Sequence, residues 1–241
     1  MEPKDRLIFA LDVANREEAL SLVELLHKDV GLFKVGWELF MEEGPQLLSD
    51  LTGKLSPSQF FLDLKLYDIP NTLRGAIHHI VHGVALITIH CDLGPGALRE
   101  IVKDMGNAFK ILAVTLLTSI SGEDLALLGY APEYANNPGE LVVLRAKLAQ
   151  AAGCHGVICS GREAGEVKQA CGDDFLVVCP GIRPAWSVVA GDDQQRVVTP
   201  YEAMKNGADY IVVGRPIRTA PDPVAAARQV VEDIAEGLAA R

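Results

Sequence analysis

The sequence predicts an α/β fold, a single closed (β/α)8 barrel (TIM barrel) over residues 1–241. Short β-rich segments alternate with longer amphipathic segments along the whole chain, and eight of the short segments can be recognised. Hydrophobic residues make up 49% of the chain and aromatic residues only 6%, which suits parallel strands buried on both faces under helices. Because no Pro- or Ser-rich linker divides the chain, we expect one domain.

The expected strands follow one another at intervals that leave room for a helix between them. They are residues 7–12, 32–36, 60–65, 86–90, 110–116, 156–159, 176–179 and 210–213. Parallel strands need long crossover connections, which helices usually supply, and eight such strands close naturally into a barrel.

Residues that start and stop helices mark the segments between the strands. Asn15 followed by Glu18 resembles a capping box, and Gly153 is placed to end a helix over residues 140–152. Asp222 and Pro223 have the types expected at the N-cap and first position of a final helix. These signals predict the helical crossovers of the barrel.

Two connections are longer than a minimal barrel needs. Residues 119–139 include Ser121-Gly-Glu-Asp124, which predicts a short additional helix, and residues 182–199 are polar without strong periodicity. Both follow expected strands, so they belong to the barrel face where enzymes of this fold carry their active sites. Long loops in compact domains often cover or bind ligands.

The charge of the chain limits its partners. Lys and Arg number 22 against 32 Asp and Glu, which gives a formal net charge of −10. A surface this acidic repels nucleic acid and anionic membranes, whereas a small anionic ligand can still be held by a few local cations.

The chain also shows no sign of secretion or membrane insertion. Its apolar segments are too short to span a bilayer, and its N-terminal residues do not form a signal-peptide pattern. The five cysteines have no C-x-x-C spacing and are expected to be reduced and buried. We therefore expect a soluble, cytoplasmic protein.

The segment F-L-D-L-K-L-Y-D-I-P-N-T (residues 61–72) contains a D-x-K-x-x-D pattern made by Asp63, Lys65 and Asp68. Residues two apart on a strand point to the same side, so Asp63 and Lys65 are expected to project together into the barrel. A buried salt bridge rarely stabilises a protein more than apolar residues would. A structural pair is one interpretation, but a functional site is favoured because the pair ends a strand in an otherwise apolar core.

Other expected strands also end in polar residues. Asp12, Lys34 and His90 occupy such positions, and for His90 a hydrogen-bonded supporting role is favoured. The last strand runs into Gly214 and Arg215. Glycine there lets the backbone approach a ligand closely, and arginine supplies a fork of donors suited to phosphate oxygens. The strand ends together predict a site at one mouth of the barrel, with a phosphate end.

Five segments together carry a resemblance to a known family. They are F-A-L-D (residues 9–12), F-K-V-G (33–36), the D-x-K-x-x-D segment, P-G-I-R (180–183) and V-G-R-P (213–216). In this order and spacing the chain resembles the bacterial orotidine 5′-phosphate decarboxylase family. The resemblance implies conversion of orotidine 5′-monophosphate (OMP) to UMP without metal or organic cofactor. It also implies a homodimer that shares its active sites across the interface.

The resemblance implies a role for each matching residue. Lys65 would donate a proton to C6 of the pyrimidine, Asp63 would lie against the substrate carboxylate, and Asp68 and Lys34 would complete the catalytic charge network. The substrate-binding residues would be Asp12, Lys34, Ile69, Thr72, Thr118, Pro180, Arg183, Gln194, Gly214 and Arg215.

Within that set, Asp12 and Lys34 would bind the ribose hydroxyls, and Thr118 would contact the pyrimidine. Asp68, Ile69 and Thr72 would reach into the neighbouring subunit's site. The phosphate would be held by Arg183, Gln194, Gly214 and Arg215, with Gln194 preferred to Gln195 because of a D-Q-x-R pattern. The chain departs from the family pattern at Leu66-Tyr67, where Phe-His is expected.

Two alternatives stay open. One is a metal-dependent 3-keto-L-gulonate 6-phosphate decarboxylase or a hexulose phosphate synthase, which share the D-x-K-x-x-D strand. Those enzymes resemble one another in placing an acidic metal ligand at the end of the second strand, where this chain has Lys34; Glu38 is expected to start the next helix. The other alternative is a non-catalytic barrel that binds a nucleotide or phosphosugar.

Overall fold

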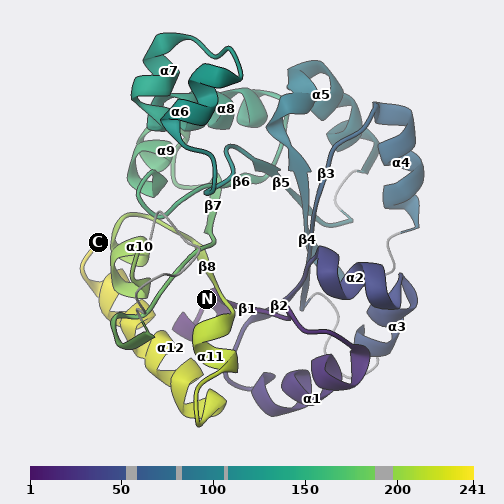
Figure 1. The fold of residues 1–241 in the computed structure, drawn as a ribbon, viewed down its shortest axis with the longest axis vertical. Coiled ribbons are helices and arrows are strands. Elements are labelled where there is room, and N and C mark those ends of the chain that lie inside the picture. The colour runs from purple at the N-terminus through teal and green to yellow at the C-terminus, as the bar shows by residue number, and fades with distance from the viewer. Residues whose placement is uncertain (53–58, 80–82, 106–107, 188–197) are drawn as a thin grey trace.

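The computed structural model describes residues 1–52, 59–79, 83–105, 108–187 and 198–241. Within them, eight parallel strands pair in chain order and close into a barrel, β8 pairing with β1 (Figure 1). The strands are β1 (Leu7–Ala10), β2 (Leu32–Val35), β3 (Phe60–Leu66), β4 (Val84–His90), β5 (Lys110–Val114), β6 (Gly156–Ile158), β7 (Leu176–Cys179) and β8 (Tyr210–Val213). The predicted fold class is confirmed.

Helices surround the barrel and connect successive strands (Figure 1). In the described parts of the chain they are α1 (Arg16–Leu26), α2 (Trp37–Glu43), α3 (Gln46–Thr52), α4 (Pro70–His78), α5 (Gly94–Met105), α6 (Gly122–Leu127), α7 (Pro132–Asn136), α8 (Pro138–Ala151), α9 (Ala164–Cys171), α10 (Pro200–Lys205), α11 (Arg215–Arg218) and α12 (Pro223–Ala239). The same described segments also form three short 3-10 helices, η1 (Pro3–Arg6), η2 (Cys91–Leu93) and η3 (Ala185–Ser187).

The strand boundaries differ from the sequence expectation by at most two residues. β1 ends at Ala10 rather than at residue 12, and β5 ends at Val114 rather than at residue 116. At both places one more backbone N–H, that of Leu11 or of Thr115, still donates to the neighbouring strand. Asp12 and Leu116, which come next, lie at the mouth of the barrel, where they can line a site.

The predicted capping residues lie at helix ends. The Asn15 side chain accepts a hydrogen bond from the Glu18 backbone N–H at 3.0 Å, and Asp222 caps α12 in the same way. Ser121 begins the predicted additional helix α6 with a complete capping box. Gly153 follows α8 with φ of 93°, a conformation that favours glycine because it has no Cβ. Local sequence therefore sets these boundaries.

The core has two layers that follow the alternation of side chains along each strand. In β1, Leu7 and Phe9 point outward into the layer between strands and helices, whereas Ile8 and Ala10 point into the barrel. The inner layer also includes Phe61 of β3 and equivalent residues of the other strands. Because apolar side chains fill the inside of the barrel, a ligand site can form only toward one of its mouths.

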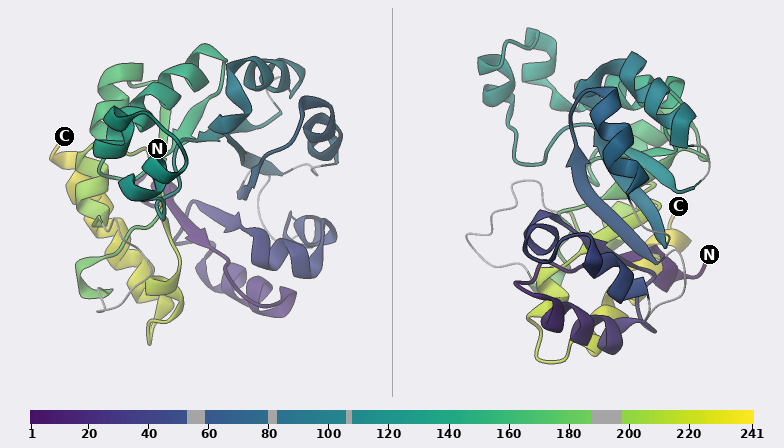
Figure 2. Two further views of the ribbon diagram at one scale, coloured as in Figure 1. Left: turned by 45° about the horizontal axis from the view of Figure 1, so that its top comes forward. Right: turned by 90° about the vertical axis from the view of Figure 1, so that its right-hand side faces the viewer.

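The two faces of the barrel differ in what covers them. In Figure 2, α6 and α7 stand out from the body on one side, and both chain termini lie toward the other. None of the helices in the described residues is long and apolar enough to cross a membrane.

Candidate active site

A cavity of about 620 Å³ lies at the carboxyl ends of the strands. Its lining comes from residues at or after the ends of β1, β2, β3, β5, β6, β7 and β8. Nine of the predicted site residues are among them: Asp12, Lys34, Asp63, Lys65, Thr118, Pro180, Arg183, Gly214 and Arg215. The structure therefore brings most of the predicted set together in one place.

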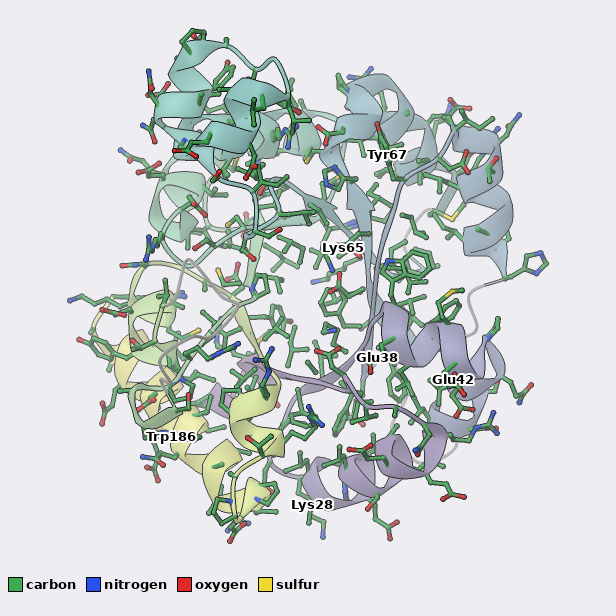
Figure 3. All side chains as sticks on the ribbon, viewed as in Figure 1. Lys28, Glu38, Glu42, Lys65, Tyr67 and Trp186 are labelled. Carbon is green, nitrogen blue, oxygen red and sulfur yellow. The ribbon has the colours of Figure 1, made fainter. Side chains whose placement is uncertain are left out.

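Asp63 and Lys65 form an ion pair inside this cavity. The Lys65 Nζ atom lies 2.8 Å from Asp63 Oδ2, and Asp63 itself is buried. The other carboxylate oxygen, Oδ1, accepts a hydrogen bond at 3.0 Å from the hydroxyl of Thr88 on β4. Both carboxylate oxygens are thus engaged, which fixes the carboxylate and, through it, the ammonium. Figure 3 shows Lys65 near the centre of the barrel.

The backbone at Lys65 is not that of a regular strand. Its φ is +46°, in the left-handed region that residues with a side chain rarely adopt, and the pairing of β3 with β4 shifts register between Leu62 and Leu66. The predicted projection of Asp63 and Lys65 to the same side is confirmed, since both line the cavity while Leu62 and Leu64 pack in the outer layer, but the regular strand backbone expected at Lys65 is not observed. An irregularity in β3 turns Lys65, and the Thr88 hydroxyl accepts the Lys65 backbone N–H at 2.8 Å. Such strain costs about 1–3 kcal/mol and is typical of functional positions.

Asp12 and Lys34 form a second pair across β1 and β2. The Lys34 Nζ atom donates to Asp12 Oδ1 at 2.9 Å, and Lys34 is buried while Asp12 is about half exposed. Gly36 makes room for this pair, because a Cβ there would lie 2.9 Å from Lys34 Nζ. The F-K-V-G segment thus has a glycine where a larger residue would crowd the lysine.

The opposite side of the cavity carries arginines. Arg183 follows β7 and is buried, and its guanidinium donates to the Ile182 carbonyl at 3.2 Å. Arg215 begins α11 directly after Gly214, the residue that follows β8. Both arginines line the cavity, as do Pro180 and Gly214. This arrangement can bind an anion between the ends of β7 and β8.

Asp68, Ile69 and Thr72 do not line the cavity of their own chain. All three are exposed, and the Asp68 carboxylate accepts the Ile69 backbone N–H at 2.6 Å. Large apolar side chains are also exposed nearby, with Tyr67 at 64% and Ile69 at 66% of their maximum exposure. The remaining predicted residue, Gln194, lies outside the described residues.

Sequence reasoning did not identify several residues at or beside the cavity. Glu18, Glu38 and Arg218 also line it, and Glu38 lies on α2, the helix expected to contain it. Thr88 was missed because a buried threonine in an apolar strand has no distinguishing pattern. Its role depends on which β3 residues face it, and only the three-dimensional register shows that.

His90 belongs to a polar network behind the cavity. Its Nδ1 atom lies 3.0 Å from Asp92 Oδ2, and Asp92 in turn pairs with the buried Arg145 of α8. The hydrogen bond with His90 is the largest cause of a lowered pKa for Asp92, and Arg145 lowers it further. The His90 ring also makes an edge contact with Tyr67, with centroids 5.8 Å apart. This network links α8 to the segment that follows Lys65.

Cys159 contributes an apolar thiol to the lining. It lies beside Cys179 of the neighbouring strand end, and this contact together with burial raises the pKa of Cys159 well above its ordinary value. All five cysteines are free. Cys159 is therefore a neutral thiol at ordinary pH and does not provide a nucleophile.

The cavity has a different charge balance from the chain. Among its described lining residues, five are basic and four are acidic, whereas the whole chain carries a net charge of −10. No group of three or more His, Cys, Asp or Glu residues suited to a metal ion occurs in the described part of the chain. The fold and the cavity define a (β/α)8-barrel protein with its charged site at the face where this fold carries out chemistry.

Comparison with known proteins assigns the family. The sequence profile of the orotidine 5′-phosphate decarboxylase / HUMPS family matches residues 5–230. The orotidine 5′-phosphate decarboxylase of Desulfosudis oleivorans is 44% identical over 237 residues, which cover 98% of this chain and 95% of that protein. That of Syntrophus aciditrophicus is 45% identical, covering 100% of this chain and 97% of the relative.

A solved structure agrees with these relatives. The crystal structure of orotidine 5′-phosphate decarboxylase from Lactobacillus acidophilus matches 95% of this chain and 98% of that chain, with a TM-score of 0.76 and 34% sequence identity. The chain therefore belongs to the orotidine 5′-phosphate decarboxylase / HUMPS family.

Proposed function

We propose that this chain decarboxylates OMP to UMP, as the names of its relatives indicate for them, with residues 1–241 acting as one catalytic domain. The observation that carries the proposal is the Lys65 ammonium, held 2.8 Å from the Asp63 carboxylate inside the charged cavity. A fixed cation beside a fixed anion suits a reaction in which a negative charge leaves one atom and develops on the next.

The chemistry uses the two charges in turn. As the bond between C6 of the pyrimidine and its carboxylate carbon breaks, carbon dioxide leaves and the electron pair stays on C6. Lys65 stabilises this carbanion and then transfers a proton from Nζ to C6, after which it regains a proton from solvent. Asp63 lies against the departing carboxylate and keeps Lys65 charged, since a nearby opposite charge favours the charged form.

The remaining cavity residues bind the rest of the nucleotide. In this proposal Asp12 and Lys34, which form an ion pair in the cavity, bind ribose hydroxyls, and Thr118, which also lines the cavity, contacts the pyrimidine. Arg183, Gly214 and Arg215, together with Gln194, hold the phosphate. Because the phosphate is remote from the bond that breaks, its binding energy can serve to assemble the site around the substrate.

We also propose that the protein works as a homodimer that shares its sites. Asp68, Ile69 and Thr72 are exposed and lie outside their own chain's cavity, while Tyr67 and Ile69 give the surface beside them an apolar character. Such a surface suits burial against a second copy. Mixing Lys65→Ala with Asp68→Ala protein is expected to restore activity in hybrid dimers. No recovery despite measured subunit exchange would contradict shared sites.

Lys34 favours this reaction over that of the metal-dependent relatives. It occupies the second-strand position where those enzymes have an acidic metal ligand, and its ammonium, 2.9 Å from Asp12, would repel Mg²⁺. The five free thiols fit a reducing compartment, and we propose a cytoplasmic location.

The decisive experiment follows the absorbance of OMP with purified, EDTA-treated protein. Conversion to UMP without added metal is the expected result. Activity only on 3-keto-L-gulonate 6-phosphate with Mg²⁺ would mean that the shared strand carries the other reaction. Nucleotide binding without turnover of either substrate would instead indicate a binding protein.

A further inference from the structure

A third ion pair at the cavity, beside Asp63–Lys65 and Asp12–Lys34, has no part in the function proposed above. Arg218, the last residue of α11, lies with its Nη1 atom 3.8 Å from Glu18 Oε1 in the first turn of α1. Both residues line the same cavity as Lys65 and Arg215. The pair therefore spans the cavity edge between the segment that follows β8 and the segment that follows β1.

Both partners stand on anchored elements. α11 is held by Pro216 and Ile217, which are buried, and the N-terminus of α1 is capped by Asn15, which accepts the Glu18 backbone N–H at 3.0 Å. The two side chains, by contrast, are 33% and 43% exposed. Exposed ion pairs of this kind are weak, and at 3.8 Å this one is longer than a hydrogen bond. The backbones of α11 and of the first turn of α1 are therefore fixed, but the Arg218 side chain can leave Glu18 for another anion.

Arg218 lies close to the end of the cavity assigned to phosphate. Residues three apart on a helix share a face, so Arg215 and Arg218 are neighbours on α11. A phosphate dianion carries more charge than the Glu18 carboxylate and can accept two parallel hydrogen bonds from a guanidinium. A phosphate held by Arg215 would therefore compete with Glu18 for Arg218.

We propose that Arg218 is an additional phosphate-binding residue and that Glu18 is its competing partner in the ligand-free protein. When a nucleoside 5′-monophosphate enters, Arg218 leaves Glu18 for the phosphate. When the ligand lacks a phosphate, Glu18 keeps Arg218. Arg218 thus makes the site prefer phosphorylated ligands, and Glu18 lowers their affinity by the free energy needed to release Arg218. This inference rests on the proposed function, because it takes the phosphate end of the cavity from it.

The test is a comparison of UMP and uridine binding by calorimetry in four proteins: wild type, Arg218→Ala, Glu18→Gln and the double variant. Arg218→Ala is expected to weaken UMP binding about tenfold and uridine binding less than about twofold. Glu18→Gln is expected to tighten UMP binding about two- to fivefold, since the competitor is gone. In the Arg218→Ala background the Glu18→Gln change should have no effect, because both act through one pair.

Arg228→Ala is the matched control. Arg228 lies on α12 and pairs with Asp29 at 2.8 Å, and neither residue lines the cavity, so its loss removes the same charge without touching the site. UMP binding by this variant should stay within about twofold of wild type, which isolates the local effect of Arg218 from the change in net charge.

Two results would overturn the inference, and they differ from a failure of the proposed function. Equal weakening of UMP and uridine in Arg218→Ala would make Arg218 a general structural residue. A further variant, Arg215→Ala, tests the phosphate end itself. Unchanged UMP binding in Arg218→Ala, with weaker UMP binding in Arg215→Ala, would support the assigned phosphate end and exclude Arg218 from it. If both variants bound UMP as wild type does, the phosphate end itself would be wrongly assigned.

Discussion

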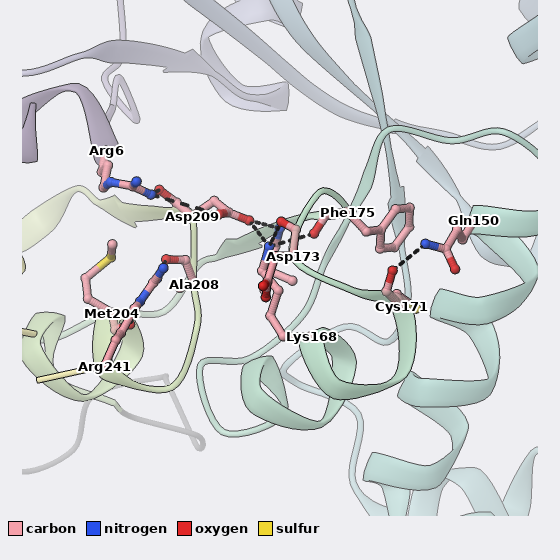
Figure 4. Close-up of polar contacts among 11 residues, drawn as sticks. Arg6, Gln150, Lys168, Cys171, Asp173, Phe175, Met204, Ala208, Asp209 and Arg241 are labelled. Carbon is pink, nitrogen blue, oxygen red and sulfur yellow. Dashed lines mark hydrogen bonds and ion pairs between the residues drawn. The ribbon is translucent and has the colours of Figure 1, made fainter. Parts of the chain in front are cut away.

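The two ends of the barrel each carry a lysine–aspartate pair of almost the same length. At the mouth, Lys65 Nζ lies 2.8 Å from Asp63, and at the opposite end Lys168 Nζ lies 2.7 Å from Asp209 (Figure 4). Lys168 also donates to the carbonyls of Asp173 at 2.7 Å and Phe175 at 2.9 Å. All three ammonium hydrogens of Lys168 therefore have partners.

Lys65 is different. Among the residues that the structure describes, Asp63 is its one side-chain partner, and the rest of its ammonium faces the cavity. At the other end, Asp209 further accepts the Val177 backbone N–H at 2.8 Å, and Arg241 donates to backbone carbonyls. The difference teaches how to separate two kinds of buried pair. An ion pair whose remaining hydrogen bonds go to backbone groups stabilises the fold. An ion pair whose lysine still has hydrogen-bond donors facing a cavity can act on a ligand.

The largest expected effect is that of Lys65→Ala. Turnover should fall by about 10⁴-fold or more, because the variant lacks both the proton donor and the cation that stabilises the carbanion. UMP binding and the free energy of unfolding should change little. OMP turnover, calorimetry with UMP and urea denaturation measure the three quantities. A near-normal kcat would contradict the assignment of Lys65 as the proton donor. A large loss of stability would mean that Lys65, like Lys168, holds the fold.

Lys168→Met should do the reverse. It removes the nearest cation from the largely buried Asp209 carboxylate, which keeps the Val177 N–H and the more distant Arg6, and it takes a donor from two carbonyls, so the free energy of unfolding should fall by about 2–4 kcal/mol. The kcat should stay within about twofold of wild type, since the change is at the far end of the barrel. Lys205→Met is the matched control, because Lys205 is exposed and contacts only the Tyr201 ring, at 5.7 Å, in the described structure. Equal stability of the two variants would contradict the assigned role of Lys168.

Thr88→Val tests what holds the mouth pair in place. The Thr88 hydroxyl bonds both the Lys65 N–H and Asp63, and valine keeps its shape without these bonds. The kcat should fall about tenfold and stability by about 1–3 kcal/mol. Thr115→Val is the control. Thr115 is equally buried, but its hydroxyl donates to the Ile158 carbonyl at 2.8 Å, so only stability should fall. Similar kcat losses in both variants would reduce Thr88 to a packing residue.

These residues also show what the sequence could and could not predict. The eight strands and the gathering of Asp12, Lys34, Asp63 and Lys65 at one mouth were predictable, since strand periodicity is local and all parallel strands end at the same face. The left-handed backbone of Lys65 was not, because a regular strand is the default for such a sequence and the irregularity depends on pairing with β4.

Pairs between distant segments were equally hidden. Arg218 and Glu18 are 200 positions apart, and only closure of β8 onto β1 brings them together. Lys168 is satisfied mainly by carbonyls, which carry no residue-specific signal. The types of side chain at the strand ends identified the mouth as a site. The backbone groups that bond to the charged residues at the other end could be found only from the three-dimensional structure.

The smallest effect concerns pH at the structural end. The ring of His155, which precedes β6, accepts the Ile111 backbone N–H at Nδ1 over 3.1 Å, so the neutral ring is the form that fits. Burial, and then the charge of Lys110, lower the pKa of His155 below its ordinary 6.5. Below pH 6.5 the unfolded chain therefore binds more protons than the folded one, and stability is lost as the pH falls. His155→Asn retains an acceptor but cannot titrate, so urea denaturation between pH 7.5 and 5.5 should give it a shallower loss than wild type. Parallel curves would mean that this hydrogen bond does not couple the structural end to pH.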